Sequence, residues 1–240
     1  MKKEVILMYS GGLDSILSCI RLVRDGFKVY LIHFDNGSSI GTENIQKGAI
    51  RLIERFKDKV EFLGIASTAA RFLHYREMVD IENLNPNELY NKYGKISMNQ
   101  YKCLLCRMAM YTYSVALARK MNIKYIAEGA RLSQLFAIEQ EELLNEFRVL
   151  CNKYNIELLT PVIEVVDDYE KEIEIAMWDL NLCAYEAKCL LGYPMNRKLT
   201  IEDIDDIKNL YTSVRYLQER DIDEERIVLE RLPKDKVTWY

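Results

Sequence analysis

The chain has 240 residues, 49% of them hydrophobic, and carries a net charge of −4 from 33 basic and 37 acidic residues. This length suits one large α/β domain, alone or with a small helical addition. No apolar run approaches the ~18 residues of a transmembrane helix, and no small-residue cleavage site follows the short run after Lys2 and Lys3. We therefore expect a cytoplasmic protein that does not enter a membrane. The acidic balance disfavours tight, unaided binding to nucleic acid.

Short apolar strands alternate with amphipathic helices along most of the chain, which indicates a mostly parallel five-stranded sheet covered by helices on both faces. A segment from Thr68 to Gln100 fits no clear element, and long irregular segments often serve as lids or binding loops. The predicted strands are residues 4–9, 29–34, 60–65, 125–127 and 158–162. The predicted helices run from residue 13 until Gly26, over 45–56, over about 103–120, and through Ile173 and Trp178.

From Ile201 onward the sequence predicts a charged helix and a tail. We accordingly expect a catalytic domain over residues 1–199 and a helical C-terminal extension over 200–240. The apolar residues Leu210, Val214 and Leu217 give the extension one hydrophobic face. That face either covers an edge of the sheet or forms a homodimer contact.

A glycine-rich turn joins the first predicted strand to the first helix. In an open parallel sheet, ligands bind beyond the carboxyl ends of the strands. Adjacent glycines let the backbone approach a ligand, and the helix N-terminus favours an anion. An acidic residue suits such a site only if it holds a metal such as Mg²⁺ or orients a donor. The turn is Ser10, Gly11, Gly12, Leu13, Asp14 and Ser15, and we predict that it binds phosphate groups.

Six cysteines are present, and in a cytosolic chain they suggest buried residues, metal ligands or redox groups more than disulfides. Cys103 and Cys106 lie one turn apart at the expected start of a helix, where the helix dipole would lower their pKa. Two cysteines complete neither a tetrahedral Zn²⁺ site nor an iron–sulfur cluster. Further ligands would come from Cys183 or Cys189, and simple core packing is the alternative.

The hexapeptide Ser10–Ser15 resembles the pyrophosphate loop of the N-type ATP pyrophosphatases, the PP-loop superfamily, rather than a Walker loop. The resemblance implies an adenine nucleotide alpha hydrolase-like fold and an enzyme that cleaves ATP to AMP and pyrophosphate while adenylylating an oxygen. His33 and Phe34, at the end of the second predicted strand, stand where such proteins contact adenine and ribose.

The central stretch is similar to that of the tRNA 4-thiouridine synthetases, on residues Cys103–Arg107, Met110, Tyr111, Gly129, Leu132–Gln134, Tyr185, Glu186 and Cys189. Carried over, the resemblance places Gly129 in the ATP site and a [4Fe-4S] cluster on Cys103, Cys106 and Cys189. The sequence departs from that family at Ala130 and Arg131. Because Cys183 lies near Cys189, either of them could be the third ligand. The N-terminal RNA-binding domains of those synthetases have no counterpart before Ser10, so a tRNA substrate would need a partner protein.

The resemblance predicts an ATP-dependent sulfurtransferase that adenylylates a carbonyl oxygen and replaces it with sulfur, on a tRNA base or a related small molecule. Asp14, Cys106 and Cys189 would be catalytic, and sulfide or a persulfide carrier would supply the sulfur. One alternative is a synthase that uses ammonia on a small molecule, like 7-cyano-7-deazaguanine synthase, with structural Zn²⁺. Another is a nucleotide-binding module without turnover.

Overall fold

The computed structural model describes residues 3–79, 87–88, 91, 94, 98–134, 136–180, 184–190 and 199–224. Its strands are β1 (Glu4–Met8), β2 (Lys28–Asp35), β3 (Ser39–Ile40), β4 (Val60–Ser67), β5 (Tyr125–Glu128), β6 (Glu157–Leu159) and β7 (Lys188–Cys189). Its helices are α1 (Leu13–Arg24), α2 (Glu43–Phe56), α3 (Ala69–Val79), α5 (Met98–Met121), α6 (Glu141–Lys153), α7 (Asp168–Ala176) and α8 (Ile201–Asp223), with short 3-10 turns η1 (Lys57–Lys59) and η3 (Ala137–Glu139).

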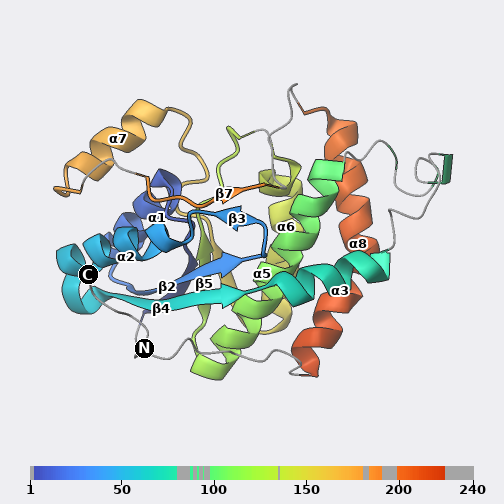
Figure 1. The fold of residues 1–240 in the computed structure, drawn as a ribbon, viewed down its shortest axis with the longest axis horizontal. Helices are drawn as coiled ribbons and strands as arrows, with labels where there is room; N and C mark the ends of the chain where they lie inside the picture. Colours follow the sequence, from blue (N-terminus) through green and yellow to red (C-terminus); the bar gives the residue numbers. More distant parts are fainter. Residues whose placement is uncertain are drawn as a thin grey trace.

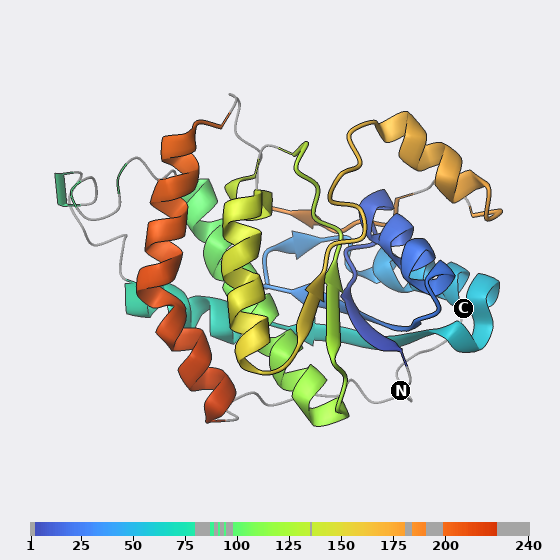
Figure 2. The same cartoon turned by 180° about the vertical axis from the view of Figure 1, so that it is seen from behind.

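Five strands form a parallel sheet in the order β4-β2-β1-β5-β6, as the alternating pattern predicts. Helices α1, α2 and α7 cover one face, and α3, α5, α6 and α8 lie on the other (Figures 1 and 2). Because both faces are buried, β1 and β2 are nearly continuous apolar runs. Successive β1 residues feed two separate cores, with Ile6 in one cluster and Leu7 in the other.

The strand order creates a switch point beside β1. The chain moves from β1 to β2 on one side, whereas β5 pairs with β1 on the other, with Met8 opposite Glu128. The loops that leave β1 and β5 therefore diverge at the carboxyl edge of the sheet. Such a divergence is where open α/β sheets bind their ligands.

Several predicted boundaries are wrong. The fifth strand ends at Leu159 rather than Val162, because Pro161 has no N–H to donate to a ladder. Trp178 lies beyond the end of α7. The long helix α5 begins at Met98, five residues before Cys103. Part of the segment that fits no clear element forms α3, and the short antiparallel pair β3–β7 is also unpredicted.

Helix α8 begins at a capping box formed by Thr200 and Asp203. Its predicted apolar residues Leu210, Val214 and Leu217 are buried in the cluster that includes α5 and α6. The described part of the extension thus packs against these two helices. The division at residue 200 and the homodimer remain predictions. Among the described helices, none combines the length and apolar character needed to cross a bilayer.

Candidate active site

The predicted phosphate loop lies at the switch point, directly before α1. Gly11 has a φ of +81°, and Gly12 is the extended N-cap residue of the helix. The Gly12 amide donates to Ser10 Oγ at 3.2 Å, and Ser10 Oγ donates to Ser15 Oγ at 3.2 Å. Ser15 Oγ in turn donates to the Gly12 carbonyl at 2.8 Å. These bonds hold the loop around a helix N-terminus, which is suited to an anion.

Gly11 also fixes the position of the chain segment that carries Cys189. Its carbonyl accepts the Tyr185 amide at 2.9 Å, and a Cβ at Gly11 would come within 2.7 Å of the Tyr185 carbonyl oxygen. Gly129, which follows β5, packs closely against the start of α1, since a Cβ there would lie 3.1 Å from the Ser15 amide nitrogen. The two glycines allow three chain segments to meet at the loop.

We expect Gly11→Ala to destabilise the protein more than Gly26→Ala. Both glycines have positive φ, which costs an L-residue about 1–2 kcal/mol. Gly26 has no neighbour within 4 Å of a built Cβ, whereas an alanine at 11 must displace the Tyr185 backbone, at a further ~1–3 kcal/mol. Urea unfolding of the two variants measures the difference. Equal losses would contradict the close approach of residues 11 and 185.

Asp14 is held by protein cations. Lys171 Nζ and Arg131 Nε lie 2.9 and 3.0 Å from Oδ1, and Gln134 donates to Oδ2 at 3.1 Å. Lys171 is buried, and both cations also pair with the exposed Asp168. Both carboxylate oxygens of Asp14 are thus occupied, so the residues present do not fit Mg²⁺ at Asp14. We derive no step through Mg²⁺.

The three predicted cysteine ligands lie together. Cys103 and Cys106 are on α5, and β7 brings in Cys189 by pairing it with Ser39 of β3. Asn36 Nδ2 lies 3.3 Å from the Cys106 sulfur and 3.9 Å from the Cys189 sulfur, so these sulfurs are at most 7.2 Å apart, the sum of the two distances. Cys183 lies outside the described residues.

The expected lowering of the thiol pKa is wrong. Burial, reinforced by the neighbouring thiols, raises the pKa of Cys103 to about 12. Burial also raises the pKa of Cys106, against the opposing hydrogen bond from Asn36. The physical reason is that α5 begins at Met98, so neither thiol lies in the first turn, where the dipole acts. Both thiols are therefore protonated at neutral pH in the free protein.

The three thiols are of the kind that hold an iron–sulfur cluster at its corners. Cys103, Cys106 and Cys189 all line the cavity and would supply three of its ligands. Zinc also takes cysteine ligands, but a tetrahedral site needs them around one ion. Among the described residues, no three His, Cys, Asp or Glu side chains are grouped in that way.

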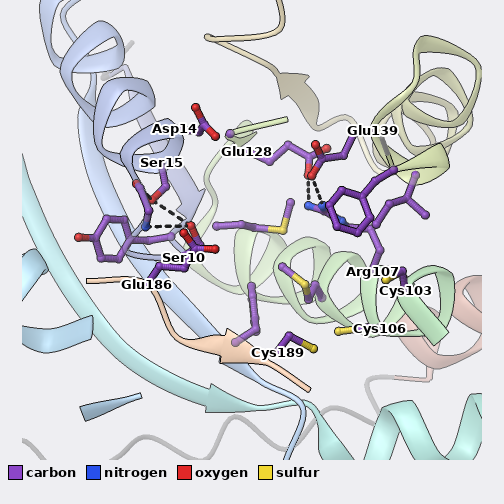
Figure 3. Close-up of a pocket in the computed structure, with 18 of the residues that line it drawn as sticks. Ser10, Asp14, Ser15, Cys103, Cys106, Arg107, Glu128, Glu139, Glu186 and Cys189 are labelled. Atoms are coloured by element: carbon purple, nitrogen blue, oxygen red, sulfur yellow. Dashed lines mark hydrogen bonds and ion pairs between the residues drawn. The ribbon is translucent and has the colours of Figure 1, made fainter. Parts of the chain in front are cut away.

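The loop and the cysteines line the same cavity, of about 340 Å³. Figure 3 shows Ser10, Asp14 and Ser15 on one side of it and the three cysteines on the other. Predicted residues His33, Phe34 and Gly129 also line this cavity. Leu13 instead packs against the core beneath the loop. His74 lies on α3, where its Nε2 accepts from Arg220 at 3.0 Å, and it does not line the cavity.

His33 offers an acceptor to a ligand. Its Nδ1 donates to the Tyr9 carbonyl at 2.9 Å, and burial lowers the pKa of the ring, so the ring is neutral. That tautomer leaves a lone pair on Nε2, which is buried and has no partner. The geometry is that of an acceptor for a hydroxyl or amine of a bound nucleotide.

A buried charge network forms another wall of the cavity. Arg107, which follows Cys106 on α5, pairs with Glu128 at the end of β5 and with Glu139 of η3, the latter at 3.1 Å. Tyr111 donates to the second oxygen of Glu128. Burial raises the pKa of Glu139 to about 7, although Arg107 opposes the shift. Glu128 could have been found from the sequence, because it is an acidic residue directly after a predicted buried strand. No comparable pattern marks Glu139 or Lys171 as residues of the site.

We expect Arg107→Met to lower the free energy of unfolding by about 3–5 kcal/mol, because Glu128 would remain buried without its counter-charge. Lys28→Met is the matched control, since its partner Glu61 is exposed and such pairs contribute at most about 1 kcal/mol. Urea denaturation reports both values. Similar small losses would mean that solvent reaches Glu128.

Comparisons with known proteins relate the chain to sequences and structures that are already characterised or named. A family model described as "Thiamine biosynthesis protein (ThiI)" matches residues 1–190. A probable tRNA sulfurtransferase of Methanocaldococcus jannaschii is 22% identical over 214 residues, which is 88% of this chain and 50% of that protein. A 7-cyano-7-deazaguanine synthase of Saccharolobus solfataricus is 25% identical over 198 residues, covering 82% of this chain and 39% of its own length.

A solved complex of a 4-thiouridine synthetase with RNA and bound ATP superposes with a TM-score of 0.55 at 16% identity, over 92% of this chain and 53% of that chain. At this identity the similarity concerns the fold alone. The chain spans about half the length, or less, of the curated relatives it matches.

Proposed function

Because the chain belongs to the ThiI family of PP-loop proteins, we propose that it is an ATP-dependent sulfurtransferase. It adenylylates a carbonyl oxygen, releases pyrophosphate, and replaces the activated oxygen with sulfur. The acceptor is a base of tRNA, in keeping with the relatives named tRNA sulfurtransferases. Since the net charge is −4, the chain alone should bind tRNA weakly, and a partner protein would strengthen that binding.

One observation carries this proposal: the phosphate loop and three cysteines line a single cavity. A sulfurtransferase that works through an adenylylated intermediate must bring the α-phosphate, the acceptor carbonyl and the sulfur together. Holding reactants in one site converts a bimolecular step into an effectively unimolecular one. A protein that only binds a nucleotide needs no thiols beside it.

The first half-reaction belongs to the loop and its cations. The Ser10 and Ser15 hydroxyls and the N-terminus of α1 bind the phosphates. Lys171 and Arg131, which pair with Asp14 in the free protein, stabilise the charge that develops as pyrophosphate leaves. His33 Nε2 accepts from the nucleoside. Arg131, a departure from the 4-thiouridine synthetases, becomes a phosphate ligand in this scheme.

The second half-reaction belongs to Cys103, Cys106 and Cys189. These three residues would hold a [4Fe-4S] cluster, which would supply a binding site for the sulfide that is transferred. A persulfide on one cysteine is the other route, but it requires a nucleophilic thiolate. Burial opposes that ionisation at Cys103 and Cys106. Cys103 and Cys106 are therefore disfavoured as persulfide carriers in the free protein.

The test is anaerobic incubation of the protein with ATP, sulfide and unmodified tRNA transcripts. Pyrophosphate release is followed by a coupled assay, and thiolated nucleosides are measured by mass spectrometry after digestion. We expect pyrophosphate and thionucleoside in equal amounts, and neither when ATP is omitted. ATP binding without pyrophosphate release under any condition would identify a nucleotide-binding module instead.

A second candidate is a synthase that uses ammonia on a small molecule, favoured by the similarity to a 7-cyano-7-deazaguanine synthase. Such an enzyme would release pyrophosphate with ammonia and a small carboxylate, and sulfide would not be needed. Replacing sulfide with ammonium and tRNA with small carboxylates in the same assay separates the two candidates.

A further inference from the structure

Glu139 carries a carboxylate oxygen that the protein leaves without a partner. Its Oε1 accepts from Arg107 Nη2 at 3.1 Å, and the nearby Arg131 backbone N–H also lowers its pKa, but Oε2 is buried and makes no hydrogen bond of normal geometry. The residue is 9% exposed and lines the cavity. A buried acceptor without a partner has lost its hydrogen bonds to water and gained none in return, which is unfavourable. Such a cost is commonly met where a ligand completes the hydrogen bond.

The other acidic residues of the cavity wall are engaged differently. Glu128 uses both oxygens, one for Arg107 and one for Tyr111. Asp14 uses both for cations and an amide. Glu186 faces the phosphate loop, with Oε2 2.8 Å from a Cβ built at Gly12. Four carboxylates line the described cavity. Of the two that pair with Arg107, Glu139 is the one whose second oxygen could accept a hydrogen bond from a ligand.

Glu139 lies within the electrostatic reach of both halves of the site. The charge of Asp14 contributes to the raised pKa of Glu139, and the charge of Glu139 contributes to that of Cys103. In Figure 3, Glu139 has Asp14 on one side and Cys103 on the other. The proposed reaction requires the acceptor carbonyl to lie between the phosphates and the sulfur. Glu139 therefore lies in the part of the cavity where that reaction would place the acceptor.

We propose that Glu139 Oε2 binds the ring N–H adjacent to the carbonyl that is thiolated, and removes that proton as the oxygen attacks ATP. The inference rests on the proposed function and deepens it. It assigns one residue, Glu139, to the N–H that neighbours the thiolated carbonyl. A carbonyl without such an N–H would be rejected, since Oε2 would stay unpaired.

The step balances in atoms and electrons. The N–H bond breaks and its proton goes to Glu139 Oε2, while the N–H electron pair forms a C=N double bond. The carbonyl π pair forms the new bond from oxygen to the α-phosphorus, and pyrophosphate leaves with the electrons of the broken P–O bond. A base suits this step when its pKa lies near the working pH. Burial and the charge of Glu128 favour such a value, against Arg107.

The test compares the wild-type chain with Glu139→Gln and Glu139→Asp in the release of pyrophosphate that depends on unmodified tRNA transcripts. We expect Glu139→Gln to lower kcat by about 10²-fold or more, the contribution of a general base. Glu139→Asp should retain an intermediate rate, and the affinity for ATP should change by less than twofold. Glu141→Gln, an exposed carboxylate on the neighbouring helix, is the matched control and should behave as wild type.

The outcomes separate the two proposals. An active wild type and an equally active Glu139→Gln variant would overturn this inference alone. A variant that loses ATP affinity instead of kcat would assign Glu139 to the adenine amine, and would also overturn it. A wild type that binds ATP but releases no tRNA-dependent pyrophosphate would overturn the proposed function, and this inference with it. Thermal unfolding of each variant confirms that a loss of rate is not a loss of fold.

Discussion

Replacing Asp14 with Asn is expected to abolish pyrophosphate release while the chain stays folded. The Asp14 carboxylate holds Lys171 and Arg131 beside the phosphate loop. An amide carries no charge, so both cations would turn toward Asp168 at the rim. Positively charged donors stabilise the transition state only when they point at the charge that develops there. Removing one such donor typically lowers kcat by about 10²–10³-fold. Here two would be misplaced together.

The control for this prediction is Asp168→Asn. Asp168 pairs with the same two cations, but its side chain is 69% exposed, whereas that of Asp14 is 20% exposed. The exposed partner is screened by water and should matter little to the rate. The coupled pyrophosphate assay measures both variants, and circular dichroism checks the fold. Unchanged release by Asp14→Asn would refute the assignment of the loop.

Much of the fold follows from local sequence, because a parallel sheet buried on both faces requires apolar strands such as β1 and β2. The predicted alternation and the five-stranded sheet are confirmed. The pair β3–β7 escaped prediction because each strand has two residues and no periodicity to read. Yet this pair is what brings Cys189 to α5, so a minor element determines the geometry of the cysteine cluster.

The site also divides into residues that local sequence marks and residues that only the folded chain brings together. The position of the proposed phosphate loop was predictable because its residues are contiguous and lie at a strand-to-helix turn. Lys171 and Glu139 were not, since each reaches the cavity from a segment whose local pattern does not distinguish it from a surface charge. The pKa of Cys103 was predicted in the wrong direction because the helix begins five residues before it and because burial in the folded protein raises the pKa. Assignments that depend on tertiary contacts were the ones that sequence patterns missed.

Replacing Cys103, Cys106 or Cys189 singly with Ala is expected to abolish thiolation and to leave tRNA-dependent pyrophosphate release near the wild-type rate. Adenylylation depends on the loop on the opposite side of the cavity, whereas sulfur transfer depends on the cysteines. We expect thiolation to fall by at least about 10²-fold, as for loss of a group that the chemistry requires. Mass spectrometry of the digested tRNA provides the measurement.

Cys19→Ala and Cys151→Ala are the matched controls, because both thiols are buried in the two hydrophobic clusters away from the cavity. They should cost about 1 kcal/mol of stability or less and leave thiolation intact. Loss of pyrophosphate release along with thiolation in the three cavity variants would mean that the cysteines serve the structure of the loop instead.

Metal analysis of the same proteins decides how the sulfur is held. After anaerobic purification, iron and sulfide in cluster proportions that vanish in each of the three variants would place the cluster on Cys103, Cys106 and Cys189. Zinc alone would favour the small-molecule synthase. Thiolation by a metal-free protein, with sulfide as the only sulfur source, would mean that free sulfide attacks the activated carbon and displaces AMP, because sulfide cannot become a cysteine persulfide without an oxidant. Repeating the assay with a persulfide donor in place of sulfide would then show whether a cavity cysteine can carry the sulfur, and the three alanine variants would show which one.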